Sequence, residues 1–196
     1  MPEVEVGQPA PSFRLVAGQG GEIGPADYRG KSNLVVWFTK GMACPFCRTQ
    51  MSQFARGLGR LKAAGVELIQ VTPTKPERAR FYVKNFPIPF PYLCDPDLSV
   101  HRAWGLGVRS HSLLWYLQKF QAAGKMEMPQ AEIGNPKTPL TELPSVLRDT
   151  DMGVFVLDRQ GVVRYRTTGA YVNEQGLRTM PTLDEILRPI QEAAAP

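Results

Sequence analysis

An unbroken apolar run, Leu34–Phe38, constrains the fold of this chain more than any other feature. A strand with one face in water alternates apolar and polar residues, whereas a continuous apolar run is typical of a strand covered on both faces. An amphipathic helix is expected from about 44 to 64, and a second apolar strand over 66–71. This order of strand, helix and strand predicts parallel pairing with a right-handed crossover, and hence an α/β protein.

The remaining elements extend this sheet. The pattern predicts helices over 76–85 and 98–104, a strand over 92–94, a hairpin formed by 153–157 and 162–167, and a last helix opened by the capping box Thr182–Glu185. Residues 107–150 interrupt the order and are interpreted as a helical insertion. The length of 196 residues, 43% apolar and 21% charged, suits one globular domain over 1–196.

Charge and apolar patterning exclude several classes of function. The net charge is +5, but the basic residues are scattered and form no block, so we expect no nucleic-acid partner. No apolar stretch reaches the roughly 18 residues that a membrane span needs, and the first residues do not resemble a signal peptide. We therefore expect a cytoplasmic protein with no membrane contact. Three cysteines, an odd number, argue against a disulfide framework.

The motif Cys44-Pro45-Phe46-Cys47 directly follows the first apolar strand and opens the amphipathic helix. A thiol at a helix N-terminus lies near unpaired backbone N–H groups and the positive end of the helix dipole, which favour the thiolate. Lys40 and Arg48 act in the same direction, and Pro45 suits the first helical turn because its missing N–H would be unpaired there. The spacing also lets the two sulfurs meet across that turn.

Two other interpretations of the cysteine pair stay open. A zinc site would need further ligands, for which the candidates are Cys94, His101 and His111, but none of them forms a second paired motif. The two cysteines could also be inert core residues. Redox or nucleophilic thiol chemistry is the preferred interpretation, with no metal and no bound cofactor expected.

Several stretches, in order along the chain, resemble segments of one known family. They are Val6–Phe13 (G-x-x-A-P-x-F), Tyr28–Lys31 with Leu34–Phe38, Cys94–Asp97 with Arg102–Leu106, and the hairpin Val154–Arg164. Together they resemble the peroxiredoxin-like, alkyl hydroperoxide reductase and thiol-specific antioxidant (AhpC/TSA) family of the thioredoxin-like superfamily. The resemblance covers about 6–106 and 150–170. It implies a thioredoxin-like fold, with a central mixed β-sheet flanked by helices, an N-terminal extension and the insertion around 107–150.

The chain departs from the family pattern around the cysteines. When Cys47 is matched to the peroxidatic cysteine of P-x-x-x-T-x-x-C, Cys44 occupies the threonine position and Lys40 the proline position, with Thr39 nearby but out of register. Met152 stands where typical members carry an arginine and thioredoxins a cis-proline, and Arg148 is the candidate replacement cation. The residues Gly41–Cys47 instead resemble a peroxiredoxin-like group with a G-x-x-C-P-[FY]-C motif.

The resemblance implies a thiol oxidoreductase. A thiolate attacks a peroxide or a substrate disulfide, the second cysteine closes a Cys44–Cys47 disulfide, and a thioredoxin- or glutathione-type reductant resets the pair. The position of Cys44 at the start of the helix favours it as the attacking thiolate, whereas alignment with the peroxidatic cysteine of the family favours Cys47. Cys94 is a candidate resolving thiol, and the chain could form a homodimer. The missing threonine and arginine imply weak activity on peroxide, and the alternative is a non-catalytic redoxin that senses redox state or binds a partner.

Overall fold

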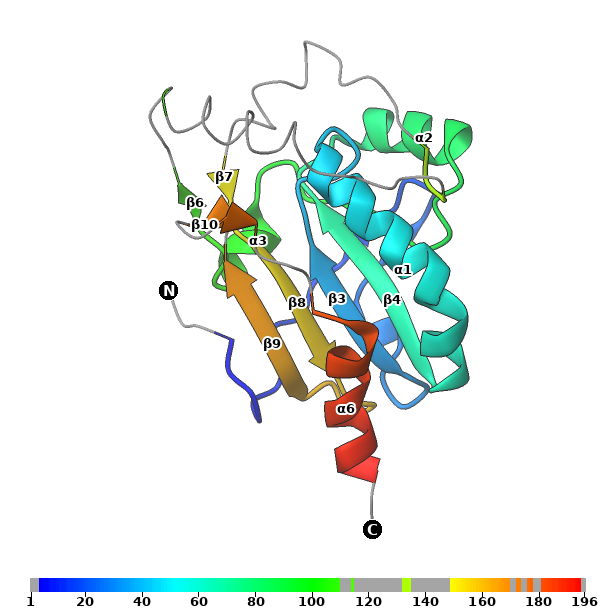
Figure 1. The fold of residues 1–196 in the computed structure, drawn as a ribbon, viewed down its shortest axis with the longest axis vertical. Helices are drawn as coiled ribbons and strands as arrows, with labels where there is room; N and C mark the ends of the chain where they lie inside the picture. Colours follow the sequence, from blue (N-terminus) through cyan, green and yellow to red (C-terminus); the bar gives the residue numbers. More distant parts are fainter. Residues whose placement is uncertain are drawn as a thin grey trace.

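A computed structural model describes residues 4–109, 114, 132–134, 149–169, 172–173, 176–177 and 181–194 (Figure 1). Its centre is a five-stranded sheet in the order β5-β4-β3-β8-β9. These strands are β3 (Asn33–Phe38), β4 (Val66–Thr72), β5 (Tyr92–Cys94), β8 (Met152–Leu157) and β9 (Val163–Gly169). The first three run parallel to one another, while β8 is antiparallel to β3 and β9 to β8. The mixed sheet predicted from the sequence is therefore confirmed.

Helices cover both faces of this sheet. One face packs against α1 (Pro45–Ala63), α2 (Pro76–Asn85) and α6 (Leu183–Ala194), and the other against α3 (Ser99–Ala103). Figure 1 shows α1 and α6 crossing the same face, where Arg60 of α1 and Asp184 of α6 form an ion pair at 2.6 Å. The sheet is thus the middle layer of three.

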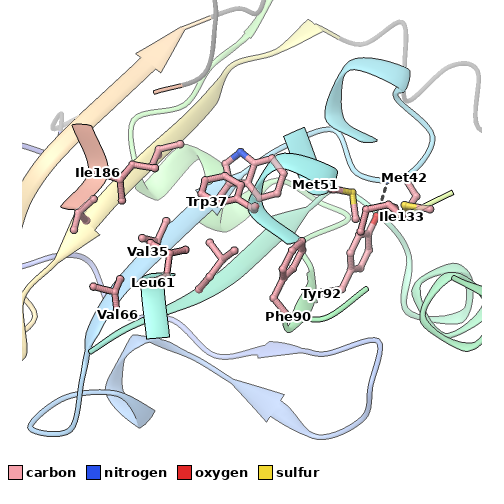
Figure 2. Packing of buried hydrophobic residues seen from close by; sticks show 14 of the residues in the cluster. Val35, Trp37, Met42, Met51, Leu61, Val66, Phe90, Tyr92, Ile133 and Ile186 are labelled. Atoms are coloured by element: carbon pink, nitrogen blue, oxygen red, sulfur yellow. Dashed lines mark hydrogen bonds between the residues drawn. The ribbon is translucent and has the colours of Figure 1, made fainter. Parts of the chain in front are cut away.

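Strand β3 is the centre of the core. All six of its residues are buried. Val35 and Trp37 pack with residues of α1 and α6 in one cluster, drawn in part in Figure 2, whereas Val36 and Phe38 pack in the cluster on the opposite face. Because successive side chains of a strand point to opposite faces, both faces need apolar residues, which explains the unbroken apolar run.

The N-terminal extension forms a small hairpin and a 3-10 turn, and it packs on the α3 face. Its strands β1 (Leu15–Val16) and β2 (Glu22–Ile23) are antiparallel, and the 3-10 helix spans Pro25–Asp27. Ala17 forms an isolated bridge with Leu93 of β5 and joins the buried cluster on that face.

Local signals mark the helix ends as the sequence predicts. Gly65 ends α1 with a φ of +68°, in the left-handed region that suits glycine. At α6, the Thr182 backbone N–H donates to the Glu185 carboxylate at 2.7 Å, and the Glu185 N–H donates to the Thr182 hydroxyl at 3.2 Å. This is the reciprocal capping box.

The insertion leaves and rejoins the fold at one place. Strand β6 (Val108–Arg109) pairs antiparallel with β7 (Asp149–Thr150). Most of the intervening positions, including His111 and Arg148, lie outside the described residues, so the helical character predicted for the insertion is not described. A further hairpin, β10 (Val172–Asn173) and β11 (Gly176–Leu177), lies between β9 and α6 in the chain. None of the helices in the described part of the chain has the length and apolar character needed to cross a membrane.

A buried hydrogen-bonded pair, Asp95 and His101, anchors α3 to the end of β5. The Asp95 carboxylate accepts the backbone N–H groups of Val100 at 3.2 Å and His101 at 2.9 Å, and its Oδ2 lies 2.6 Å from His101 Nδ1. Both side chains are fully buried. Burial raises the pKa of Asp95, but hydrogen bonds from the His101 side chain and backbone outweigh it and lower that pKa to about 2. His101 therefore connects α3 to the end of β5 through the Asp95 carboxylate.

We predict that Asp95→Asn lowers the free energy of unfolding at pH 7 by about 2–3 kcal/mol, because it removes a buried carboxylate that is hydrogen-bonded to His101 Nδ1 and to two backbone N–H groups. The pKa of Asp95 is about 2 in the folded protein and 3.8 in the unfolded chain. The ionised carboxylate therefore stabilises the fold fully above pH 3.8, and this contribution is lost as pH falls through about 2. The difference in unfolding free energy between wild type and Asp95→Asn narrows over the same interval. Chemical denaturation at several pH values measures it. The exposed Asp97, which accepts the Ser99 N–H, supplies the control Asp97→Asn, with a loss of about 1 kcal/mol or less. Equal losses of unfolding free energy in Asp95→Asn and Asp97→Asn would contradict the role of Asp95 as the anchor of α3.

Candidate active site

The cysteine pair lies at the carboxyl end of β3, where the chain turns into α1. Cys44 is the N-cap residue, with extended backbone (φ −92°, ψ 119°), and Pro45 is the first helical residue. The backbone N–H groups of Phe46 and Cys47 lower the pKa of Cys44, although its side chain makes no capping hydrogen bond. A helix N-terminus leaves these N–H groups without partners inside the helix, so a thiolate at the N-cap lies near them and near the positive end of the dipole.

The two thiols differ in acidity. The pKa of Cys44 falls to about 7. The largest cause is the interaction with the Cys47 thiol, which lowers this pKa, whereas burial raises it. The charge of Lys40 and the two backbone N–H groups lower it further. Burial raises the pKa of Cys47 well above its usual value, and the hydrogen bond to Cys44 adds to the rise. Of the two thiols, Cys44 is therefore the more readily ionised, and Cys47 is the one that keeps its proton. Of the two assignments left open by the sequence, these electrostatics favour Cys44.

Met152 completes the surroundings of the pair. Phe38, the last residue of β3, pairs with Gly153 of β8, and this register puts Met152 beside the end of β3. The Met152 Sδ lies 3.8 Å from Cys47 Sγ. Cys44, Cys47 and Met152 form a buried apolar cluster, against which the half-buried Phe46 packs. The position at which the family resemblance implies an arginine thus holds a soft, neutral thioether.

The loop before Cys44 is held by side chains of the sheet. Thr39 Oγ1 accepts hydrogen bonds from the Gly41 backbone N–H and from the Gln70 side-chain amide on β4, both at 2.9 Å. Gly41 in turn accepts the Cys44 N–H at 3.2 Å. The sequence predicts Thr39 as a residue that supports the site. In the structure its hydroxyl contacts Gly41 and Gln70, so Thr39 supports the loop before Cys44.

Two further side chains fix Met42, in the middle of this loop. The Met42 N–H donates to the Tyr92 hydroxyl at 3.0 Å, drawn as a dashed line in Figure 2, and Arg48 Nη1 donates to the Met42 carbonyl at 2.7 Å. The Tyr92 hydroxyl is also hydrogen-bonded to Thr74 Oγ1 at 2.8 Å. Gly41 has a φ of +75°, and a Cβ there would collide with the Tyr92 hydroxyl, so glycine is required. The sequence predicts no role for Tyr92 at the site, because its pattern identifies Tyr92 only as a strand residue.

The cations predicted near the pair are in place. Lys40 favours the charged form of both thiols. Arg48 is 4% exposed; burial lowers its pKa, and the charges of Cys44 and Cys47 act against that decrease. Arg48 therefore has two connections to the site, through its charge and through the Met42 carbonyl.

The third cysteine lies elsewhere in the core. Cys94, at the end of β5, packs in the large cluster around Trp37, and the small cluster of the cysteine pair does not include it. Burial raises the pKa of Cys94 to about 11. Its resolving role remains a prediction without a supporting contact. Within the described ranges, no three His, Cys, Asp or Glu side chains gather in an arrangement suited to a metal ion.

Comparison with known proteins gives a consistent result. The model of the AhpC/TSA family matches residues 6–166. A Mycobacterium tuberculosis protein named as a peroxiredoxin is 35% identical over 99 residues, which are 50% of this chain and 62% of that protein. Peroxiredoxin Bcp of Escherichia coli is 28% identical over 106 residues, 54% of this chain and 67% of the relative. The match to the M. tuberculosis protein thus spans less than two thirds of that relative's length.

Solved structures share the fold. Peroxidoxin BcpB of Mycobacterium tuberculosis superposes with a TM-score of 0.63, covering 98% of this chain and 100% of that one, at 12% identity. Reduced 2-Cys peroxiredoxin of Plasmodium vivax gives 0.63 over 96% and 95%, at 16% identity. At these identities the likeness establishes the fold, which is thioredoxin-like as predicted.

We predict that iodoacetamide alkylates Cys44 with a midpoint near pH 7, because its pKa falls to about 7, and that Cys47 reacts only in strongly alkaline solution. Lys40→Met moves the midpoint upward and slows alkylation at pH 7 about threefold, since a partly exposed ion pair contributes about 0.2–1 kcal/mol. Mass spectrometry of each modified peptide measures both. Lys31→Met, which removes an exposed lysine, is the matched control and keeps the wild-type profile. A midpoint near 9 for wild-type Cys44 would show that the thiol is not activated.

We predict that Tyr92→Phe slows alkylation of Cys44 while the fold is retained. The Met42 N–H then lacks its acceptor, which costs about 1–3 kcal/mol, and the loop before Cys44 loses one of its anchors. Thermal unfolding and alkylation rate are measured together. Tyr28→Phe removes a half-buried hydroxyl in the cluster on the opposite face and leaves the alkylation rate unchanged. Slowing by Tyr28→Phe to the same degree would assign the effect to general destabilisation.

Proposed function

Because this chain belongs to the AhpC/TSA family, we propose that it is a thiol-dependent oxidoreductase in which Cys44 is the attacking thiolate and Cys47 the resolving thiol. One observation carries the proposal: Cys44 has a pKa of about 7 at a helix N-cap, with the Cys47 thiol hydrogen-bonded to it. The attacking group and the group that releases the product thus lie in contact before a substrate arrives.

The order of attack follows from exposure and acidity together. Cys44 is 4% exposed and Cys47 is completely buried, so an incoming substrate reaches Cys44 first. A thiol with a pKa near the ambient pH combines a large thiolate fraction with good nucleophilicity. Cys47 keeps its proton until the first step has consumed the charge on Cys44, because that charge is one of the causes that raise the pKa of Cys47.

With a disulfide substrate, the Cys44 thiolate attacks one sulfur, a Cys44–substrate disulfide forms and the other substrate sulfur leaves as a thiolate. Cys47 then loses its proton and attacks Cys44 sulfur, which closes the Cys44–Cys47 disulfide and releases the second substrate thiolate. The substrate is reduced by two electrons and the protein is oxidised by two. A thioredoxin- or glutathione-type dithiol or thiol reverses the oxidation, which suits a reducing compartment such as the cytoplasm.

With a hydroperoxide, the Cys44 thiolate would take the terminal oxygen and release an alcohol or water, and Cys47 would condense with the sulfenic acid and release water. This step builds negative charge on the leaving oxygen, which needs hydrogen-bond donors aimed at it. The cluster around the pair supplies the Met152 thioether instead, and Arg48 Nη1 is bonded to the Met42 carbonyl. A leaving thiolate is stabilised by its own low pKa and needs less help. We therefore infer that disulfides are the better substrates.

We predict that the reduced protein reacts faster with an aromatic disulfide than with hydrogen peroxide. Loss of a charge-stabilising donor lowers rates about 10²–10³-fold in comparable sites, so the peroxide reaction is slow by that order relative to a site that has such donors. Stopped-flow measurement of thiol loss against each oxidant, at equal concentration and pH 7, gives the two second-order rates.

Variants identify the steps. Cys47→Ser retains one substrate equivalent as a stable mixed disulfide on Cys44, Cys44→Ser reacts with neither oxidant at neutral pH, and Cys94→Ser behaves as wild type. A peroxide rate above the disulfide rate would overturn the substrate assignment. Wild-type reactivity in Cys44→Ser would overturn the assignment of the attacking thiol, and inertness of the wild-type protein toward both oxidants would leave the non-catalytic redoxin as the correct description.

A further inference from the structure

Three sulfur atoms from two distant parts of the chain meet at the end of β3. The Cys47 thiol donates to Met152 Sδ on β8 at 3.8 Å, and Cys44 packs in the same buried cluster. All three residues are buried, at 4%, 0% and 6% exposure for Cys44, Cys47 and Met152. The proposed redox cycle uses the two cysteines and leaves Met152 without a task.

The distance between the Cys47 and Met152 sulfurs matches that of two ligands on one small metal ion. Metal–thiolate bonds are about 2.3 Å long, so two sulfurs on one trigonal metal lie about 4 Å apart. The 3.8 Å between the Cys47 and Met152 sulfurs fits this separation. We propose that the reduced protein binds one copper(I) ion through the Cys44 and Cys47 thiolates and the Met152 thioether, an activity beyond the proposed thiol redox function.

The ligand set points to copper(I) among the common metals. Thiolate and thioether sulfurs are soft ligands, which suit copper(I). Zinc sites in proteins use Cys, His, Asp and Glu side chains, and a structural zinc needs four of them. In the described part of the chain, no third side chain of these types joins the two cysteines in a metal-binding arrangement. The third ligand offered here is a thioether, which distinguishes the site from a zinc half-site.

The surrounding charges suit the complex. Both cysteines bind the metal as thiolates, and one copper(I) ion with two thiolates carries a net charge of −1. The side chains of Lys40 and Arg48 both interact electrostatically with the two cysteines, and the N-terminus of α1 adds its positive dipole end. A buried anionic centre therefore has compensating charge on two sides.

The site is confined to the reduced protein. A Cys44–Cys47 disulfide has no thiolate to offer, and a lone thioether is a weak ligand, so oxidation removes two of the three ligands together. Conversely, copper held by both sulfurs prevents the pair from attacking a substrate. Copper binding and the redox cycle are therefore mutually exclusive states of one site.

The test is an anaerobic titration of the reduced, full-length chain with copper(I) against bicinchoninate, a chromophoric copper(I) chelator. We expect one copper per chain, protection of Cys44 and Cys47 from alkylation, and three sulfur ligands by X-ray absorption spectroscopy. Met152→Leu keeps the size and apolar character of the residue and lowers copper affinity by about tenfold or more, since even indirect partners of a metal contribute 10–100-fold. Met51→Leu, a buried methionine of α1 in the large core cluster, is the matched control and binds as wild type.

Three results would overturn the proposal: no copper retained by wild-type protein against the chelator, equal affinity in Met152→Leu and wild type, or equal losses in Met152→Leu and Met51→Leu. Circular dichroism checks that each variant is folded. The sulfur count on wild-type protein needs no variant, and a count of two would remove Met152 from the site whether or not Met152→Leu folds.

Discussion

The site depends on the position of β3, the central strand of the sheet, which is covered on both faces. Its residues fill two separate clusters, and its carboxyl end is the point from which the loop, the N-cap cysteine and α1 are placed. The parallel neighbour β4 contributes Gln70 to that loop, and β5 contributes Tyr92. The antiparallel neighbour β8 contributes Met152 from the other side. Residues more than a hundred positions apart thereby reach the same pair of sulfurs.

Burial and hydrogen bonding act in opposite directions at this site, and their balance separates the two thiols. Burial alone disfavours both thiolates. Cys44 overcomes it because the Cys47 thiol, two backbone N–H groups and Lys40 all stabilise its charge, whereas Cys47 lies one turn inside the helix without equal compensation. The same asymmetry governs the proposed chemistry, in which Cys44 acts first and Cys47 is released for the second step. Rigid support of the loop by Tyr92 and Arg48 keeps Cys44 where these partners converge.

The substitution of a thioether for a charged group gives this site its particular character. Met152 is neutral and polarisable, and it offers no N–H or O–H to a developing oxyanion. That chemistry disfavours peroxide cleavage and is compatible with sulfur exchange. It also creates the third soft ligand for copper(I), which no search restricted to Cys and His spacing would find. One residue of β8 thus bears on both the substrate class and the proposed metal.

The sequence by itself determined the elements, their order and the motif. Apolar periodicity, the Gly65 stop, the capping box at Thr182 and the cysteine pair after an apolar strand are local signals, and local backbone chemistry was sufficient to interpret them; the family resemblance ordered them into a thioredoxin-like fold. Other features required the tertiary structure. Tyr92 and Gln70 reach the loop only through the sheet order, Met152 reaches Cys47 only through the register of β8 on β3, and Cys94 is directed into a different cluster. The proposal of Cys44 over Cys47 as the attacking thiol also rests on the tertiary structure, because a pKa depends on burial and on partners in space, neither of which the spacing of a motif specifies.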